Sequence, residues 1–166
     1  MAELARARWA ARGLFLVLGM LCGAWGAHVP SVRSHYGLSE GLLSLVLLAG
    51  AVGAVSALFG AGRVVGRLGA RRAAALSSVL LCAVLGSVLN HAGLWTLLPA
   101  MWALGATMSL FDVAINSEGT ALEAQGGRAV MSHLHGMFSV GGMAGAGGVA
   151  LLLAHGVAAP VQLALL

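Results

Sequence analysis

Charge is scarce in this sequence. Only 8% of its 166 residues are charged, against roughly 25% in an ordinary soluble domain. Lysine is absent, and all nine basic residues are arginines. So few charged side chains cannot cover the surface of a water-soluble protein of this length, and 60% of the residues are hydrophobic. The composition therefore predicts a protein whose main solvent is the lipid bilayer.

Cysteine is also rare, and the usual catalytic groups are missing. Cys22 and Cys82 lie in separate apolar runs and are too few for a disulfide framework or a metal site, so we interpret them as small packing residues. No HExxH motif and no serine–lysine pair occurs. The arginines form short clusters between apolar runs and not one basic face of a soluble fold, which argues against nucleic acid as a partner. We expect no enzymatic activity and no cofactor.

Stretches without charge have the length of membrane spans. Residues 13–32 and 41–62 contain no charged side chain, and each matches the roughly 20 residues that cross about 30 Å of hydrocarbon. Polar turn signals at 90–93 and near 155–160 divide the two longer uncharged stretches. The sequence therefore predicts an all-α membrane protein with one transmembrane domain over residues 1–166. Its expected spans are approximately 13–32, 41–62, 73–89, 94–114 and 131–154, with an incomplete sixth at 157–166.

The arginines predict the orientation of these spans. Eight of them precede the first span or fall between spans two and three or four and five: Arg6, Arg8, Arg12, Arg63, Arg67, Arg71, Arg72 and Arg128. Only Arg33 falls on the other side, so the positive-inside rule places the N-terminus in the cytoplasm. We expect 1–12, 62–72 and 117–129 in the cytoplasm and 33–39, 90–93 and 155–160 outside. Residues 1–27 could instead be a cleaved signal peptide, but the charge alternation requires the first span to remain.

Glycine is abundant inside the expected spans. Gly19 and Gly23 are four residues apart in the first span, and Gly141 and Gly145 have the same spacing in the fifth. Small residues at this spacing let helix backbones approach closely in lipid. We expect close helix packing at these positions, or surfaces along which helices slide during transport.

The segment between the second and third spans resembles a known signature. It reads Gly62-Arg-Val-Val-Gly66-Arg67-Leu-Gly69-Ala-Arg71-Arg72, which is similar to the loop of the major facilitator superfamily at the same place. Gly66 departs from the pattern, because the family usually has an aspartate there that takes part in a cytoplasmic latch. The resemblance implies a gating role for Gly62, Arg67, Gly69, Arg71 and Arg72.

A second resemblance covers nearly the whole chain. The stretches Asp112–Glu123, His135–Gly142 and Trp25–Arg33 look like bacterial sugar/proton symporters of the fucose permease type. That family has twelve spans in two six-helix halves, which implies an N-terminal half here and a missing C-terminal half as its partner. Residues 141–150 lack the proline that drug/proton antiporters carry in span five.

Ionisable side chains within the spans are candidates for the solute and proton path, because their burial in lipid is costly. Asp112 and Asn116 are four residues apart and share a helix face. His135 and Ser139 have the same spacing on the next span, so a short antiparallel hairpin could join Asp112 to His135 for proton exchange. The alternative is an interfacial aspartate and histidine that only reach water.

Three further residues complete the predicted site. Trp25 and His28 lie near the outer end of the first span, where the tryptophan could stack on a sugar ring or only anchor the interface. Glu118 lies toward the cytoplasmic edge of span four, where solvation is the alternative role. The chain is therefore expected to act in a bacterial inner membrane as part of a multi-pass, proton-coupled transporter of a small polar solute such as a sugar. The alternatives are a non-transporting or half-size membrane protein and a drug or metabolite exporter.

Overall fold

The computed structural model describes residues 2–165, and every regular element in that part of the chain is helical. The elements are α1 (Ala2–His35), α2 (Glu40–Leu68), α3 (Ala70–Ser87), the 3-10 turn η1 (Val88–Asn90), α4 (Leu94–Gly126), α5 (Met131–Ala154) and α6 (Ala159–Ala164). The first five α-helices, α3 counted together with η1, are long and apolar enough to cross a membrane, which agrees with the predicted all-α membrane protein. α6 has six residues, so a sixth span stays a prediction.

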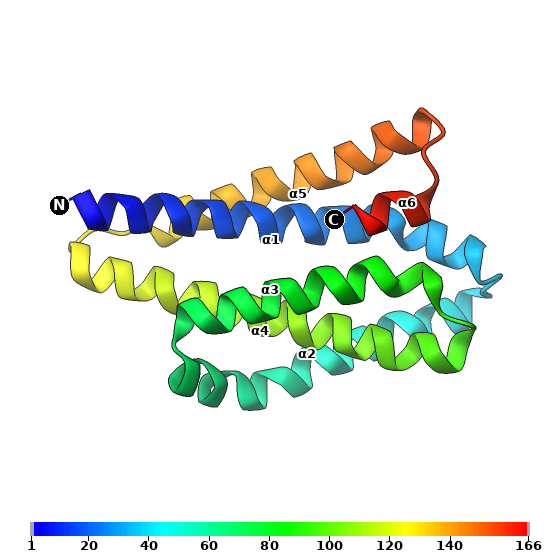
Figure 1. Cartoon of the computed structure of the whole chain (residues 1–166), viewed down its shortest axis with the longest axis horizontal. Helices are drawn as coiled ribbons and strands as arrows, with labels where there is room; N and C mark the ends of the chain where they lie inside the picture. The colour runs from blue at the N-terminus through cyan, green and yellow to red at the C-terminus, as the bar shows by residue number, and fades with distance from the viewer. Residues whose placement is uncertain (1, 166) are drawn as a thin grey trace.

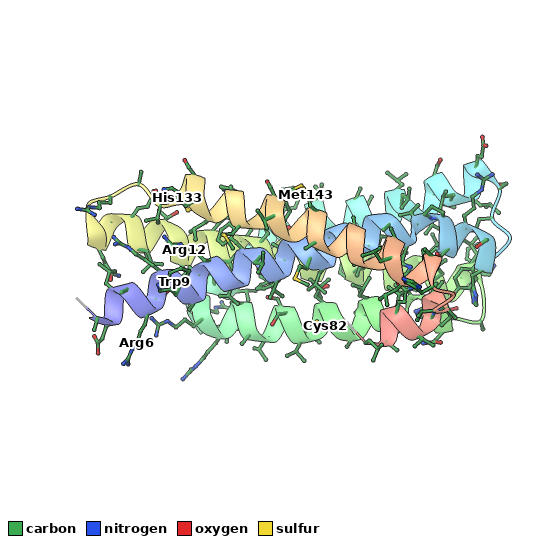
Figure 2. The ribbon with its side chains drawn as sticks, turned by 90° about the horizontal axis from the view of Figure 1, so that it is seen from above. Arg6, Trp9, Arg12, Cys82, His133 and Met143 are labelled. Carbon is green, nitrogen blue, oxygen red and sulfur yellow. The ribbon has the colours of Figure 1, made fainter. Side chains whose placement is uncertain are left out.

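The long helices run alternately up and down one elongated bundle (Figure 1). The N-terminus and the α2–α3 and α4–α5 connections lie toward one end, and the α1–α2, α3–α4 and α5–α6 connections lie toward the other. Figure 2 shows Arg6, Trp9 and Arg12 along the N-terminal end of α1, with His133 at the same end of the bundle. Successive connections therefore lie at alternate ends of the bundle, as the distribution of the arginines predicts.

The helices extend well beyond the predicted spans. α4 has 33 residues, and at 1.5 Å per residue it is about 50 Å long, which exceeds the roughly 30 Å of a hydrocarbon core. Charged residues mark where the apolar surface ends and not where the helix ends, because arginine, glutamate and glutamine are good helix formers. The expected loops at 1–12 and 117–129 are therefore mostly helical.

The segment 62–72 is likewise helical and is not an open loop. α2 continues to Leu68 and α3 begins at Ala70, which leaves Gly69 as the single residue between them. Its φ of 79° lies in the left-handed region that glycine adopts without steric cost. The Gly69 amide still donates to the Val65 carbonyl at 2.8 Å, so the chain reverses direction with almost no connecting segment.

α1 and α5 are in backbone contact along a seam of glycines, as their four-residue spacing predicts. A Cβ atom at Gly19 would overlap the Phe138 carbonyl, and one at Gly141 would overlap the Leu16 carbonyl. Gly23 meets Gly142 in the same way, and Gly145 meets Met20. We call this contact the α1–α5 seam. The close-packing prediction is confirmed, because no side chain fits between the two helices at these positions.

A second seam, which the sequence analysis did not predict, joins α2 to α4. A Cβ at Gly53 would overlap the Trp102 carbonyl, and a Cβ at Gly105 would overlap the Gly50 carbonyl. We call this contact the α2–α4 seam. α3 also packs against α4, and Figure 1 shows most of α1 running between α5 and α3.

Polar contacts tie the ends of the bundle together. At one end the Tyr36 hydroxyl donates to the Val88 carbonyl at 2.7 Å and accepts from the His91 amide at 3.1 Å. At the other end the Glu123 carboxylate accepts from the amides of Val130 and Met131 at 2.7 and 2.9 Å. These two amides open α5, so Glu123 caps that helix from the part of α4 that extends beyond the expected span. The two hydrogen bonds lower the pKa of Glu123, because both favour the ionised carboxylate.

Candidate functional site

A cavity of about 360 Å³ lies between the two glycine seams. α1 and α5 form one wall, and α2 and α4 form the other. Its lining is mostly apolar and consists of Leu18, Cys22, Trp25, Leu47, Gly50, Ala51, Ala54, Met101, Leu104, Gly105, Met108, Ser109, Asp112 and Phe138. A concave, apolar space with a few polar groups is the usual form of a small-molecule site.

Asp112 supplies the one charged side chain among the described residues of this lining. It continues a stripe along α4 that begins at Met101 and passes through Gly105 and Met108, positions three or four residues apart that share one face of the helix. The Asn116 side-chain amide donates to the Asp112 carboxylate at 3.0 Å and to its carbonyl at 2.9 Å. The predicted shared face of Asp112 and Asn116 is thus observed, and the amide holds the carboxylate beside the cavity.

His135 does not pair with Asp112, although the two residues lie near enough to interact electrostatically. The described structure contains no ion pair between these two side chains. The His135 ring instead packs edge-on against Phe15 of α1, with the ring centroids 5.4 Å apart. Ser139 donates to the His135 carbonyl within its own helix at 3.2 Å. α4 and α5 are consecutive antiparallel helices, but α5 packs mainly against α1 along their seam and has few contacts with α4. Proton exchange between Asp112 and His135 stays a prediction.

Trp25 and His28 take different positions. Trp25 lines the cavity, whereas His28 is fully buried in the protein and does not line it. His28 belongs to the buried row of α1 that includes Leu21, Ala24 and Val32. Neither of its ring nitrogens has a hydrogen-bond partner within the described part of the chain. Of these two candidates for the solute path, Trp25 therefore borders the cavity and His28 lies in the core, and a binding role for either stays a prediction.

Glu118 lies away from the cavity, toward the end of the bundle that holds the N-terminus. The Arg71 Nε lies 3.4 Å from the Glu118 Oε1, and the arginine side chain is 81% exposed. An ion pair this exposed contributes at most about 1 kcal/mol. The pair borders a second cavity of about 560 Å³, which is lined by Glu3, Arg6, Ala7, Ala10, Ala11, Leu14, Arg71 and Glu118.

The remaining residues of the predicted gating segment surround the α2–α3 turn. Gly62 and Arg67 belong to the end of α2, and Arg72 belongs to the first turn of α3. A Cβ at Gly66 would meet no atom within 4 Å, so the glycine that replaces the family's aspartate is not required by packing.

Most residues of the cavity wall could not be predicted from the sequence. Cys22, interpreted as a packing residue, lines the cavity, and its thiol donates to the Met108 sulfur at 3.6 Å. Met101 and Phe138 were not singled out either. The signal that could have found the α4 residues is the three-to-four-residue stripe that leads to Asp112, the one carboxylate well inside a predicted span.

The chain matches no protein-family model and no solved structure. It is 36% identical over 139 residues to an uncharacterized MFS-type transporter of Yersinia pestis, which covers 84% of this chain and 36% of the relative. The uncharacterized transporter y4wD of Sinorhizobium fredii is 32% identical over 81% of the chain and 36% of its own length. The membrane protein MosC of Rhizobium meliloti is 30% identical over 79% of the chain and 32% of its own length.

The chain thus spans about a third of the length of the curated relatives that it matches. The match covers 79–84% of this chain in each case. Together with five helices long enough to cross a membrane, the similarity to an MFS-type transporter supports membership of the major facilitator superfamily.

Proposed function

We propose that this chain forms the N-terminal half of a secondary transporter of the major facilitator type. The observation that carries the proposal is the cavity between the two seams, where a single carboxylate, Asp112, faces an apolar space of small-molecule size. Secondary transporters bind their solutes near the bilayer midplane between two helical halves. Relatives named as transporters support this reading.

The second half would cover the open side of the cavity. α2 presents a row of exposed apolar side chains beside it, among them Leu48, Val52 and Val55, and α5 presents Val140 and Met143. These surfaces suit either lipid or another helical half. A truncated or half-size protein that assembles with a separate half would use the same surfaces, and it is the alternative to a single longer chain.

Asp112 is proposed as the proton-coupling residue. A carboxylate bordering a cavity can exchange a proton with water on whichever side the cavity is open, and Asn116 holds it in place. His135 and Ser139 of α5, which lie outside the described lining, are secondary candidates. The likeness to fucose-permease-type symporters favours a sugar as the solute. An exporter of drugs or metabolites is the competing assignment within the same superfamily.

Proton-driven flux by the full-length protein that contains this chain tests the proposal. Reconstituted in liposomes with an internal pH dye, the wild type should move protons when a transported solute is added. Asp112→Asn should abolish that coupled flux at unchanged protein abundance, because an amide cannot carry the proton. His135→Ala should keep coupling and alter its pH dependence. Normal coupled flux by the Asp112→Asn protein would refute the assignment of Asp112.

The proposed orientation places the N-terminus in the cytoplasm of a bacterial inner membrane. Eight of the nine arginines belong to segments at the N-terminal end of the bundle, as the positive-inside rule requires. Single cysteines at Ala70 and Asn90 should be labelled from opposite sides of the membrane. Labelling of both positions from one side would contradict this topology.

A further inference from the structure

The composition of the cavity lining restricts the kind of solute that it suits. Two lining residues, Ser109 and Asp112, carry side-chain oxygen, and Trp25 adds one indole N–H. The rest of the lining is hydrocarbon, aromatic ring or sulfur. Loss of water from a hydroxyl group without a new hydrogen bond is unfavourable. A sugar with several hydroxyl groups would leave most of them unpaired against this wall.

The described lining carries negative charge and no positive charge. Asp112 has no arginine beside it in the cavity, and the described lining contains no basic side chain. His135 of α5 does not line the cavity, and its ring packs against Phe15 and forms no ion pair with the carboxylate in the described structure. A carboxylate that borders a mostly apolar cavity and has no basic side chain beside it in the lining favours a ligand that brings a positive charge.

The surfaces around Asp112 suit a ligand that carries an apolar group next to its positive charge. Met101 and Met108 lie within one to three helical turns of Asp112 on the same face, and methionine adapts its shape to varied ligands. Trp25 and Phe138 offer aromatic surface from the other wall. Cations are attracted to aromatic faces, tryptophan above all.

We propose that the cavity binds an organic cation whose charged nitrogen pairs with Asp112 and whose apolar body packs against Trp25, Met108 and Phe138. This inference rests on the proposed transporter function and names its substrate class. The expected solute is then not a polar sugar. It is a molecule with one positive charge, which the carboxylate of Asp112 compensates.

Equilibrium binding to the purified full-length protein tests the substrate class. The probes are benzyltrimethylammonium and tetraethylammonium, with L-fucose and D-galactose as neutral polar probes. The cations should bind and the sugars should not. Asp112→Asn should weaken cation binding at least about 30-fold, as expected when one partner of a charge pair between ligand and protein is removed. Asp112→Glu should restore much of the affinity.

The variants separate a binding role from a structural one. Trp25→Leu should weaken binding of benzyltrimethylammonium about three- to tenfold through the lost cation–π contact, while Trp95→Leu, at an exposed position outside the cavity lining, should leave it unchanged. The binding of a variant is compared with that of the wild type only if the variant elutes as a single species in size-exclusion chromatography.

Three outcomes are decisive. Asp112-dependent cation binding supports the inference. Sugar binding that depends on Asp112, without cation binding, overturns the cation class and leaves the transporter proposal standing. Absence of binding by all four probes overturns the cation class as well, and absence of any solute-driven proton flux in the liposome assay would then remove the transporter proposal separately.

Discussion

The two glycine seams and the space between them are built in opposite ways. Along the α1–α5 and α2–α4 seams, backbone meets backbone and a single added methyl group would overlap a carbonyl. Where these pairs face each other, side chains form the boundary and leave about 360 Å³ between them. In lipid, helix association depends on close packing more than on the hydrophobic effect. The seams therefore hold α1 against α5 and α2 against α4. The cavity lies between these two helix pairs, where side chains do not fill the space.

The largest expected effect comes from filling a seam. Gly141→Ala should destabilise the protein by about 1–3 kcal/mol or more, because α1 and α5 must move apart to admit the methyl group. Gly147→Ala is the matched control on the same helix, since a Cβ there meets no atom within 4 Å. Thermal unfolding of both variants in detergent measures the difference. Equal midpoints for the two variants would show that α1 and α5 are not in backbone contact.

A smaller effect is expected at the end of the bundle, where α4 caps α5. Glu123→Gln should lower stability near neutral pH, because the ionised carboxylate accepts two amide hydrogen bonds. The pKa of Glu123 is lowered in the folded protein, so its contribution is present above the ordinary pKa of a glutamate and is lost as the pH falls through the lowered value. Unfolding midpoints of wild type and variant should converge in acid. A constant difference at every pH would contradict this account.

The smallest effect is expected at His28, and it separates this residue from Trp25. Burial of an imidazole without hydrogen-bond partners is unfavourable, so an apolar replacement of similar size can be neutral or stabilising. His28→Leu should keep or slightly raise the unfolding temperature and leave solute binding unchanged. Loss of binding at normal stability would return His28 to the site.

Much of the helical framework could be read from the sequence, because it depends on local chemistry. The uncharged stretches located five spans, and the spacing of Gly19, Gly23, Gly141 and Gly145 predicted a close contact. Helix ends were misjudged, since charge marks the edge of the apolar surface while Arg and Glu continue the helix, as α4 shows by running to Gly126.

Neighbour relations between helices were harder to predict. Periodicity shows which residues share a face but not which helix that face meets, so α4 and α5 were paired because they are consecutive in the chain. The structure pairs α1 with α5 instead. Because α5 packs against α1, the His135 ring contacts Phe15 and not Asp112. Asp112 could be singled out from sequence as a costly intramembrane charge, whereas its cavity partners Cys22, Met101 and Phe138 carry no such signal.

The central claim is that the space between the seams is a water-accessible solute cavity. Cysteine labelling tests it most directly, in the full-length protein freed of its other cysteines. Ser109→Cys lines the cavity, and Val79→Cys lies on an exposed face of α3 outside it. With both membrane sides open to a charged maleimide, we predict that Ser109→Cys is labelled and Val79→Cys is not, since lipid would cover the latter. Labelling of Val79→Cys alone, or of both positions at equal rates, would contradict the account.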